Sequence, residues 1–428
     1  MRFSLKASAA LTITVGTLLA PAATAHAAVT THNSSDVGLF GAGDPTYDGA
    51  FRQSLGLLAE AAGGVHDTAA IAWLVNQQCP DGGWTSYRAD LSQPCPKTDL
   101  NAFTGEDSNS TALAVQALHA LGVTPKYDAI TFLHSLQDSD GGFPLLAGSG
   151  TDPNSTALVV QAIDVIGQDP TSAAWTVGGK TPMDALMASW LGCGSPDPGA
   201  FSSPFSSGHG DLVASVQAVW GAEQKSFPFT SSSTATKPAL DCTGNPPTPT
   251  PTQAGQDAAT WLAGKLTTSG YLTTGSSPDY SLTAQGALAM LASGTNSSGS
   301  TSALNYLATN IKAAVLDTHG NISPGALGYI ALAAHAAGRS MTSFGGLDLL
   351  TELTSVRRAL PTTVTHKPAT KPATHPVTVP IAKPSAQHTS QLPLTGTAAA
   401  TEAGIAGDCI VAGMVLLLLG RRRRAAKP

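Results

Sequence analysis

Charged and aromatic side chains are scarce in this chain. Of its 428 residues, 12% are charged and 6% are aromatic. So few aromatic rings leave little π surface for stabilising a carbocation, which argues against carbocation chemistry. The hydrophobic share of 42% is enough for a core, and 44 glycines and 29 prolines predict many turns. The composition therefore indicates an alanine-rich helical body and a proline-rich tail.

Basic residues are especially few in the body of the chain. Residues 28–360 hold 12 Lys and Arg against 26 Asp and Glu, a net charge of −14. Residues 361–395 hold three Lys and no acidic residue. Because an acidic body repels nucleic acid and anionic membranes, no nucleic-acid partner is expected. A ligand of this body is expected to be neutral or cationic.

The N-terminus has the pattern of a secretory signal. Arg2 and Lys6 form a short basic region, residues 7–20 are apolar, and Ala25-His26-Ala27 has the A-x-A form of a cleavage site. Residues 1–27 are therefore interpreted as a signal peptide, so that the rest of the chain is secreted.

A second targeting pattern lies near the C-terminus. Its motif consists of Leu392, Pro393, Leu394, Thr395 and Gly396, and an apolar run at 405–419 and four arginines at 421–424 follow it. This order resembles the sorting signal of Gram-positive cell-wall proteins. The resemblance implies that a sortase cuts between Thr395 and Gly396 and joins Thr395 covalently to peptidoglycan.

The sorting interpretation assigns residues 392–428 to the signal and 403–420 to a transient membrane segment. The apolar run is shorter than the roughly 20 residues of a permanent span, and it contains Asp408. The mature protein would be anchored in the cell wall after a brief passage through the plasma membrane. The alternative is an ordinary C-terminal transmembrane anchor with a chance LPxTG before it.

Five cysteines are present, and Cys409 lies in the tail that a sortase would discard. The other four would be outside the cell, where an even number favours disulfides. Of three connectivities, pairing between neighbours in sequence favours Cys79–Cys95 and Cys193–Cys242. A metal site is the competing interpretation, but none of the four cysteines belongs to a C-x-x-C pair.

One phrase recurs within the body. NSTALAVQAL at 109–118 returns as NSTALVVQAI at 154–163, and looser copies begin at Asp211 and Ser281. A period of about 45 residues is typical of stacked helical hairpins. Each copy opens with Asn, Asp or Ser, which can cap a helix, and three copies close on glycine, which suits a helix end. These glycines are Gly122, Gly167 and Gly221.

A second phrase alternates with the first. WLVNQQCPDGGW at 73–84 matches FLHSLQDSDGGF at 132–143, with weaker copies at 190–201 and 261–271. The shared residues are Gln78, Gly82 and Trp84 in one copy and Gln137, Gly141 and Phe143 in the other. This pattern resembles the QW motif of the squalene cyclase and prenyltransferase repeat. The resemblance implies that each Gln caps a helix end, that the aromatic residue packs over it, and that hairpins are thereby joined.

Periodic apolar segments between Gly and Pro predict twelve helices. They span 49–62, 67–78, 109–122, 126–137, 154–167, 181–192, 209–222, 255–267, 279–293, 299–314, 324–338 and 343–357. The resemblance implies an all-α fold over 28–360, an (α/α)6 toroid with the odd-numbered helices inside. A Ser/Thr/Pro-rich insertion at 231–252 interrupts it, and two smaller helical domains are the alternative. Residues 361–391 are interpreted as a wall-spanning stalk, because Pro/Thr/Lys-rich sequence cannot bury a core.

The catalytic signatures of related toroids are incomplete here. The acid motif D-x-D-D of the cyclases is nearest to Asp138-Ser139-Asp140-Gly141, which lacks the last Asp. The prenyltransferase zinc site needs Asp-x-Cys, whereas Asp241 and Cys242 are adjacent. The thioester of complement-type proteins needs Gln three residues after Cys, but Pro196 stands at that position after Cys193. No catalytic residue, metal or cofactor is therefore assigned. The scattered histidines are expected to be surface or packing residues.

Glutamine recurs on the predicted inner helices, at Gln53, Gln116, Gln161, Gln217 and Gln285. Such amides could line a pore, or each could bond to the backbone of the neighbouring hairpin. The sequence favours a sortase-anchored surface protein whose toroid binds an unidentified ligand at the pore mouth without catalysis. The alternatives are an extracellular enzyme, either terpenoid-cyclase-like or polysaccharide-processing, and a passive structural surface protein.

Overall fold

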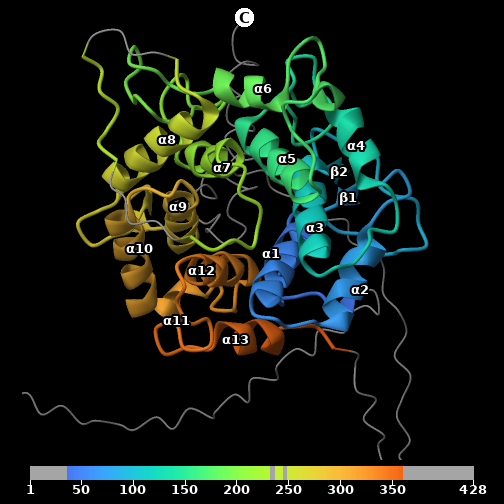
Figure 1. The fold of residues 1–428 in the computed structure, drawn as a ribbon. Coiled ribbons are helices and arrows are strands. Elements are labelled where there is room, and N and C mark those ends of the chain that lie inside the picture. Colours follow the sequence, from blue (N-terminus) through green and yellow to red (C-terminus); the bar gives the residue numbers. More distant parts are fainter. Residues whose placement is uncertain (1–35, 232–236, 244–247, 360–428) are drawn as a thin grey trace, which may run out of the picture. The chain divides into compact units, whose positions relative to one another are not determined.

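The computed structural model describes residues 36–231, 237–243 and 248–359, which belong to one compact unit. Thirteen α-helices lie within these residues (Figure 1). They are α1 Gly49–Ala62, α2 Thr68–Gln77, α3 Ser108–Ala120, α4 Ala129–Leu136, α5 Pro153–Val165, α6 Pro182–Ala188, α7 Leu212–Ala222, α8 Pro251–Lys265, α9 Tyr280–Ala292, α10 Ser297–Thr309, α11 Ile311–Ala314, α12 Pro324–Ala336 and α13 Leu349–Ser355. Two antiparallel hairpins pair β1 (Trp84–Thr85) with β2 (Glu106–Asp107), and β3 (Thr273–Thr274) with β4 (Ser277–Pro278).

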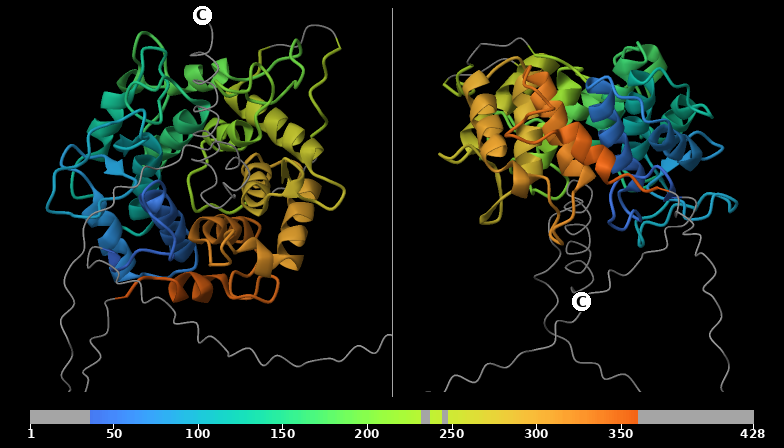
Figure 2. Two further views of the ribbon diagram at one scale, coloured as in Figure 1. Left: turned by 180° about the vertical axis from the view of Figure 1, so that it is seen from behind. Right: turned by 90° about the horizontal axis from the view of Figure 1, so that it is seen from below.

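Six helices form a closed inner ring. Each of α1, α3, α5, α7, α9 and α12 contacts the next in this order, and α12 returns to α1. Helices α2, α4, α6, α8, α10 and α13 pack around the outside of this ring (Figure 2). This arrangement confirms the (α/α)6 toroid. Because α7 contacts both α8 and α9, the helices on either side of the Ser/Thr/Pro-rich stretch belong to one ring.

The inner helices are buried on nearly every side. Every residue of α3 from Ser108 to Leu118 is buried, because other inner helices flank it and an outer helix covers it. Apolar residues therefore recur all round these helices and not along a single stripe. Small residues let the axes approach: a Cβ on Gly221 of α7 would lie 2.9 Å from the Cα of Ala157 in α5.

Gly221 corrects one sequence expectation. It was expected to end a helix, but it lies inside α7, where the close contact with α5 requires the absence of a side chain. Gly122 and Gly167 do follow helix ends and have positive φ, at +66° and +75°. Glycine thus serves two different purposes in otherwise similar copies of the repeat.

Aspartates begin most of the helices. Asp107 accepts a hydrogen bond from the Ser110 backbone N–H at 2.6 Å, and Asp152 accepts one from Asn154 at 2.9 Å. The expectation that Asn109 and Asn154 open these helices was wrong, because the carboxylates two residues earlier bind the free N–H groups and complement the helix dipole. Within the described residues, aspartate stands at the N-cap of eight helices: Asp48, Asp67, Asp107, Asp128, Asp152, Asp211, Asp279 and Asp348.

Several predicted boundaries also differ from the structure; for example, the helix expected at 343–357 spans only Leu349–Ser355 as α13. The helix expected at 299–314 is broken at Asn310 into α10 and α11. Helix α8 begins at Pro251, inside the predicted insertion, where Thr250 and Gln253 form a reciprocal capping box. Thr250 therefore marks the N-cap of α8 and not the middle of a linker.

Ion pairs join the first and last described segments. Phe40 and Arg357 form an isolated antiparallel bridge. Arg358 Nη1 lies 2.7 Å from a carboxylate oxygen of Asp36, and Arg357 pairs with Asp67 ahead of α2. Because Arg358 and Asp36 are both buried, loss of either would leave a buried charge uncompensated. These contacts fix the seam where the ring closes.

Within the described ranges, no helix is long and apolar enough to cross a membrane. The predicted signal peptide 1–27, stalk 361–391, sorting motif and membrane segment 403–420 lie outside the residues that the structure describes.

Candidate functional site

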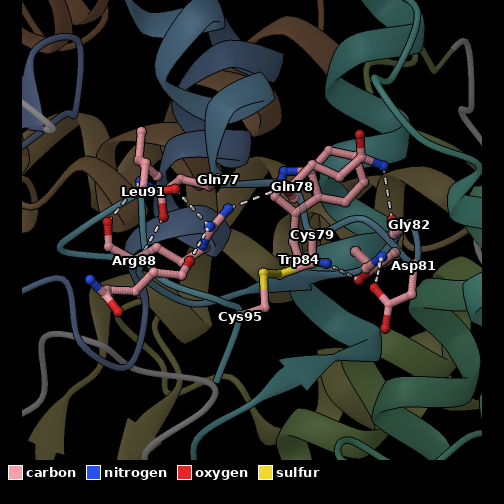
Figure 3. Close-up of a disulfide and its surroundings, with 12 residues drawn as sticks. Gln77, Gln78, Cys79, Asp81, Gly82, Trp84, Arg88, Leu91 and Cys95 are labelled. Atoms are coloured by element: carbon pink, nitrogen blue, oxygen red, sulfur yellow. Dashed lines mark hydrogen bonds between the residues drawn. A yellow bond between two sulfur atoms is a disulfide. The ribbon is translucent and has the colours of Figure 1, made fainter. Parts of the chain in front are cut away.

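Gln78 holds the turn that follows α2, close to the Cys79–Cys95 disulfide (Figure 3). Its Nε2 donates to the carbonyl oxygens of Gly82 and Tyr127, and its Oε1 accepts from the Tyr127 backbone N–H, each at 2.9 Å. Tyr127 precedes α4. A single buried amide therefore joins one helix pair to the next.

Gln137 occupies the matching turn after α4. Its Nε2 donates to the carbonyl oxygens of Gly141 at 2.9 Å and Trp175 at 2.8 Å, and Trp175 lies shortly before α6. The glycines of both turns have positive φ, and a Cβ on either would collide with a backbone carbonyl of the next hairpin. The recurring phrase therefore positions the backbone of one hairpin against the backbone of the next.

The aromatic residue of each turn is anchored through its backbone. The N–H of Trp84 donates to Thr111 Oγ1 at 2.9 Å, and that of Phe143 donates to Thr156 Oγ1 at 3.0 Å. Sequence reasoning missed these hydroxyls, although each stands four residues after the aspartate that caps its helix. The same contact recurs between Phe201 and Ser215 and between Leu272 and Thr283.

The two predicted disulfides are present. Cys79 bonds to Cys95 and Cys193 bonds to Cys242, with Cα atoms 6.0 Å and 5.3 Å apart. The second bond ties the end of α6 to the chain ahead of α8. Because both thiols of this bond are oxidised, Cys193 cannot carry a thioester and Cys242 cannot ligate zinc in this state.

The Asp138-Ser139-Asp140 string forms part of the Gln137 turn. Thr151 Oγ1 donates to Asp140 at 2.7 Å, and the backbone N–H of Gly142 donates to the same carboxylate oxygen at 3.0 Å. Burial raises the pKa of Asp138, to which Thr151 also donates. These bonds give the string a role in shaping the turn.

The five recurrent glutamines are all buried in the helical ring. Gln53 is fully engaged with backbone: it donates to Gly38 and Ala70 and accepts from Phe40. Relative to the capping aspartates, Gln116 and Gln161 stand at matching positions, whereas Gln217 and Gln285 stand three residues earlier. The glutamines therefore do not form one level ring of amides.

A segment between α7 and α8 crosses the ring beside the C-terminal halves of its inner helices. The Phe227 backbone N–H donates to Gln116 Oε1 of α3 at 3.0 Å, Gln161 Nε2 of α5 donates to the Lys225 carbonyl, and the Ser231 N–H donates to the Ala336 carbonyl of α12 at 2.8 Å. Residues 225–231 thus reach from one side of the inner ring to the other.

The side chain of Phe227 fills the space that this segment crosses. Its ring centroid lies 5.0 Å from that of Trp220, which in turn lies 6.1 Å from Tyr329 on α12. All three side chains are almost completely buried. Aromatic packing therefore fills this end of the ring and leaves no space there for a ligand.

A pocket of about 590 Å³ opens beside the turn between α3 and α4. Its apolar lining includes Val115, Val123, Ile130 and Ile166, and its polar lining includes His119, Thr124, Lys126, Tyr127 and Asp128. The Lys126 ammonium lies 5.0 Å from the centroid of the Tyr127 ring. The volume falls within the roughly 300–1,000 Å³ of small-molecule sites.

Structural contacts hold the pocket wall in place. The Tyr127 backbone bonds to Gln78, and the Asp128 carboxylate accepts from the N–H groups of Ile130 and Thr131 at 3.0 Å and 3.2 Å. These bonds lower the pKa of Asp128, with the hydroxyl of Thr131 as the largest cause. The turn that bears Lys126 and Tyr127 is therefore pre-organised.

The carboxyl groups of Asp81 and Glu106 form a pair near the Cys79–Cys95 disulfide. Burial, and then a hydrogen bond with Asp81, raises the pKa of Glu106 to about 8. Burial also raises the pKa of the adjacent Asp107 to about 6, against its bonds to the backbone of Ser110. Glu106 therefore holds a proton at neutral pH beside an exposed carboxyl group.

Comparison with known proteins identifies no family. No family model matches the chain, and no curated protein matches it in sequence. Among solved structures, ent-copalyl diphosphate synthase from Streptomyces platensis is 15% identical, with a TM-score of 0.44 over 68% of this chain and 50% of that chain. A glycosyl hydrolase family 88 protein from Bacteroides vulgatus is 14% identical, with a TM-score of 0.40 over 69% of this chain and 92% of that chain. A type II terpene cyclase from Scytonema is 11% identical, with a TM-score of 0.38 over 64% and 71%. The chain spans about half the length of the synthase, and such likenesses concern the arrangement of helices alone.

Proposed function

We propose that this protein is a binding protein that holds a neutral, partly apolar small molecule in the pocket between α3, α4 and the end of α5. The pocket of about 590 Å³ is the observation that carries this proposal. This proposal differs from the pore mouth expected from the sequence; Phe227 and its aromatic neighbours lie at one end of the ring, by the C-terminal halves of the inner helices.

The lining favours a ligand with an apolar body and a polar edge. Val115, Ile130 and Ile166 supply aliphatic surface, while the hydroxyl of Tyr127 and the ring of His119 offer hydrogen bonds. Lys126 and Asp128 carry opposite charges on the same turn, so the rim has no net charge. A neutral ligand loses the least hydration energy on entering such a site.

A neutral fluorescent probe, N-phenyl-1-naphthylamine, tests the proposal on the purified full chain. Val123→Trp places a large side chain in the pocket and should abolish the fluorescence increase that binding produces. Arg339→Trp is the matched control, because Arg339 follows Gly338 at the end of α12 as Val123 follows Gly122 at the end of α3. Equal binding by Val123→Trp and wild type would exclude this pocket as the probe site.

We also propose that the toroid is displayed on a cell wall through Thr395. The proposal is supported by the order of LPxTG motif, apolar run and four arginines in the sequence. Sortase and peptidoglycan would then be its processing enzyme and its covalent partner. Thr395→Ala should release the protein from the wall fraction, and an unchanged wall-bound fraction would contradict the assignment.

An extracellular enzyme is the second candidate, and the carboxyl pair Asp81 and Glu106 favours it. Two hydrogen-bonded carboxyls that share a proton can act as an acid and a base. If the pair is catalytic, Asp81→Asn should abolish any turnover and leave probe binding at the α3–α4 pocket unchanged.

A further inference from the structure

Three tyrosines gather on the opposite sector of the ring, where α8, α9 and α10 meet. Tyr271 lies in the loop after α8, Tyr280 is the first residue of α9, and Tyr306 lies on α10. The ring centroids of Tyr271 and Tyr306 are 4.6 Å apart, and those of Tyr280 and Tyr306 are 6.0 Å apart with planes inclined by 17°. All three side chains are partly exposed. Of seven tyrosines in the chain, three therefore share one surface.

The backbone around this cluster is fixed. The Thr267 N–H donates to the Tyr271 carbonyl at 2.9 Å, and Thr274 Oγ1 donates to Asp279 at 2.6 Å, which ties the β3–β4 hairpin to the start of α9. Gly270 has a φ of +88° and approaches Ser302 of α10 so closely that a Cβ would collide with its hydroxyl. The tyrosine rings are thus presented on a rigid scaffold, which reduces the entropy lost on binding.

The surface around the tyrosines is almost free of charge. Between Leu266 and Ile311 the only charged residue is Asp279, which is buried and accepts hydrogen bonds from the Leu282 N–H and Thr274. Lys265, at the edge, pairs with Asp197 at 3.1 Å. The remaining polar side chains of this stretch are hydroxyls and amides. Within this stretch a charged ligand would find no exposed partner of opposite sign; Lys265 and the exposed Lys312 flank it.

Tyrosine and uncharged hydroxyl groups together match the chemistry of a sugar. A pyranose presents C–H groups on its face and hydroxyls around its edge, and a tyrosine presents a π face and a hydroxyl. Burial raises the pKa of Tyr306 to about 12, and a hydrogen bond with Tyr280 contributes, so the two phenol groups lie together on this surface. Clustered tyrosines on a rigid frame are also typical of binding hot spots.

We propose that the Tyr271–Tyr280–Tyr306 surface binds a neutral pyranose oligosaccharide, as a second site that is independent of the α3–α4 pocket. The outer faces and edges of the Tyr271 and Tyr280 rings, which pack on either side of Tyr306, contact the apolar sugar faces, and the phenol groups bond to the sugar hydroxyls. This site would let the toroid contact a glycan even when the α3–α4 pocket is empty.

Titration of the full chain with cellotriose and N-acetylchitotriose, followed by saturation-transfer difference NMR and calorimetry, tests this proposal. At least one of these probes should bind, and Tyr306→Ala and Tyr271→Ala should each weaken it by at least tenfold. Tyr306→Phe keeps the ring and should lose less than Tyr306→Ala. Tyr47→Ala is the control, because Tyr47 is 44% exposed and lies away from the cluster.

Circular dichroism and binding of N-phenyl-1-naphthylamine separate lost folding from lost sugar contact. If Tyr306→Ala fails to fold, the Tyr271→Ala variant decides, because Tyr271 lies in a loop. Lack of binding by both oligosaccharides, or equal binding by wild type and Tyr271→Ala, would overturn the proposal. A dimer in wild type that Tyr271→Ala converts to monomer would overturn it as well, since a second copy would then occupy the surface.

Discussion

The side chain of Gln78 and the backbone of Tyr127, 49 residues later, exchange two hydrogen bonds of 2.9 Å. The donor and acceptor of one amide are thereby both used to join α2 to α4. Tyr127 also lines the α3–α4 pocket, so the same contact shapes the candidate ligand site. Ring assembly and pocket geometry are therefore linked through one residue.

Replacing Gln78 by Ala should destabilise the protein by about 1–3 kcal/mol, because the carbonyl of Gly82 and the backbone of Tyr127 would lose their partner. Urea unfolding followed by far-UV circular dichroism measures the change. Gln93→Ala in the neighbouring exposed loop is the control and should cost little. Unchanged stability of Gln78→Ala would show that this contact does not join the hairpins energetically.

Gly221→Ala should destabilise the protein by about 1–3 kcal/mol, because the new methyl group would overpack the contact with Ala157. Gly264→Ala lies in the exposed end of α8 with no heavy atom within 4 Å of the added Cβ. That variant should gain about 0.5–1 kcal/mol from higher helix propensity. The opposite order of the two melting temperatures would contradict the close approach of α5 and α7.

Replacing Cys79 and Cys95 together by Ser should cost about 3 kcal/mol, as expected for a loop of this length. The Cys193–Cys242 bond closes a longer loop, so the same change there should cost about 4 kcal/mol. Chemical denaturation of both variants tests the order. A loss far below these values at Cys79–Cys95 would show that Arg88, which binds the carbonyls of Leu91 and Gln93, holds the loop without the bond.

Glu60 should make stability fall as the pH rises. Burial, with the charge of Asp67 nearby, raises the pKa of Glu60 to about 7, against the effect of Arg357. The folded state therefore keeps a proton that the unfolded chain, with a pKa of about 4.3, releases. Between about pH 4.5 and 7 the folded state binds more protons, so raising the pH destabilises it.

Glu60→Gln removes this ionisation and should raise stability relative to wild type more at pH 8 than at pH 5. Urea midpoints at both pH values provide the measurement. Asp169→Asn is the control: hydrogen bonds from Thr171 lower the pKa of Asp169, so this carboxylate is ionised at both pH values and the effect of its replacement should be the same at pH 5 and pH 8. A Glu60→Gln effect that is equal at both pH values would rule out a buried protonated carboxyl.

The helix pairs could be predicted from the sequence because the pattern of each helix and turn is local. The repeated phrases supply period and punctuation, and Cys79 and Cys95 stand close enough in the chain to favour their bond. The N-cap of α3 was predicted two residues too late, because Asn109 and Asp107 are both good acceptors. Only the fold shows that Asp107 accepts the hydrogen bond from the helix N–H.

Features that depend on distant segments could not be predicted. Phe227 fills one end of the ring because its segment bonds to α3, α5 and α12 at once, and no local pattern records these contacts. The pocket likewise needs Val115 and Ile166, which come from two different hairpins. The tyrosine surface is assembled from three separate elements, so its composition is visible in the sequence only after the fold is known.

The most direct measurement is to incubate the purified full chain with a lipid extract from which glycans have been removed, because the tyrosine surface would retain glycans in every variant, and to identify retained and altered compounds by mass spectrometry. Wild type and Arg339→Trp should retain the same neutral compound unchanged, and Val123→Trp should lose it. Equal retention by Val123→Trp, or conversion of any compound that heat denaturation abolishes, would contradict a binding protein with its ligand in the α3–α4 pocket.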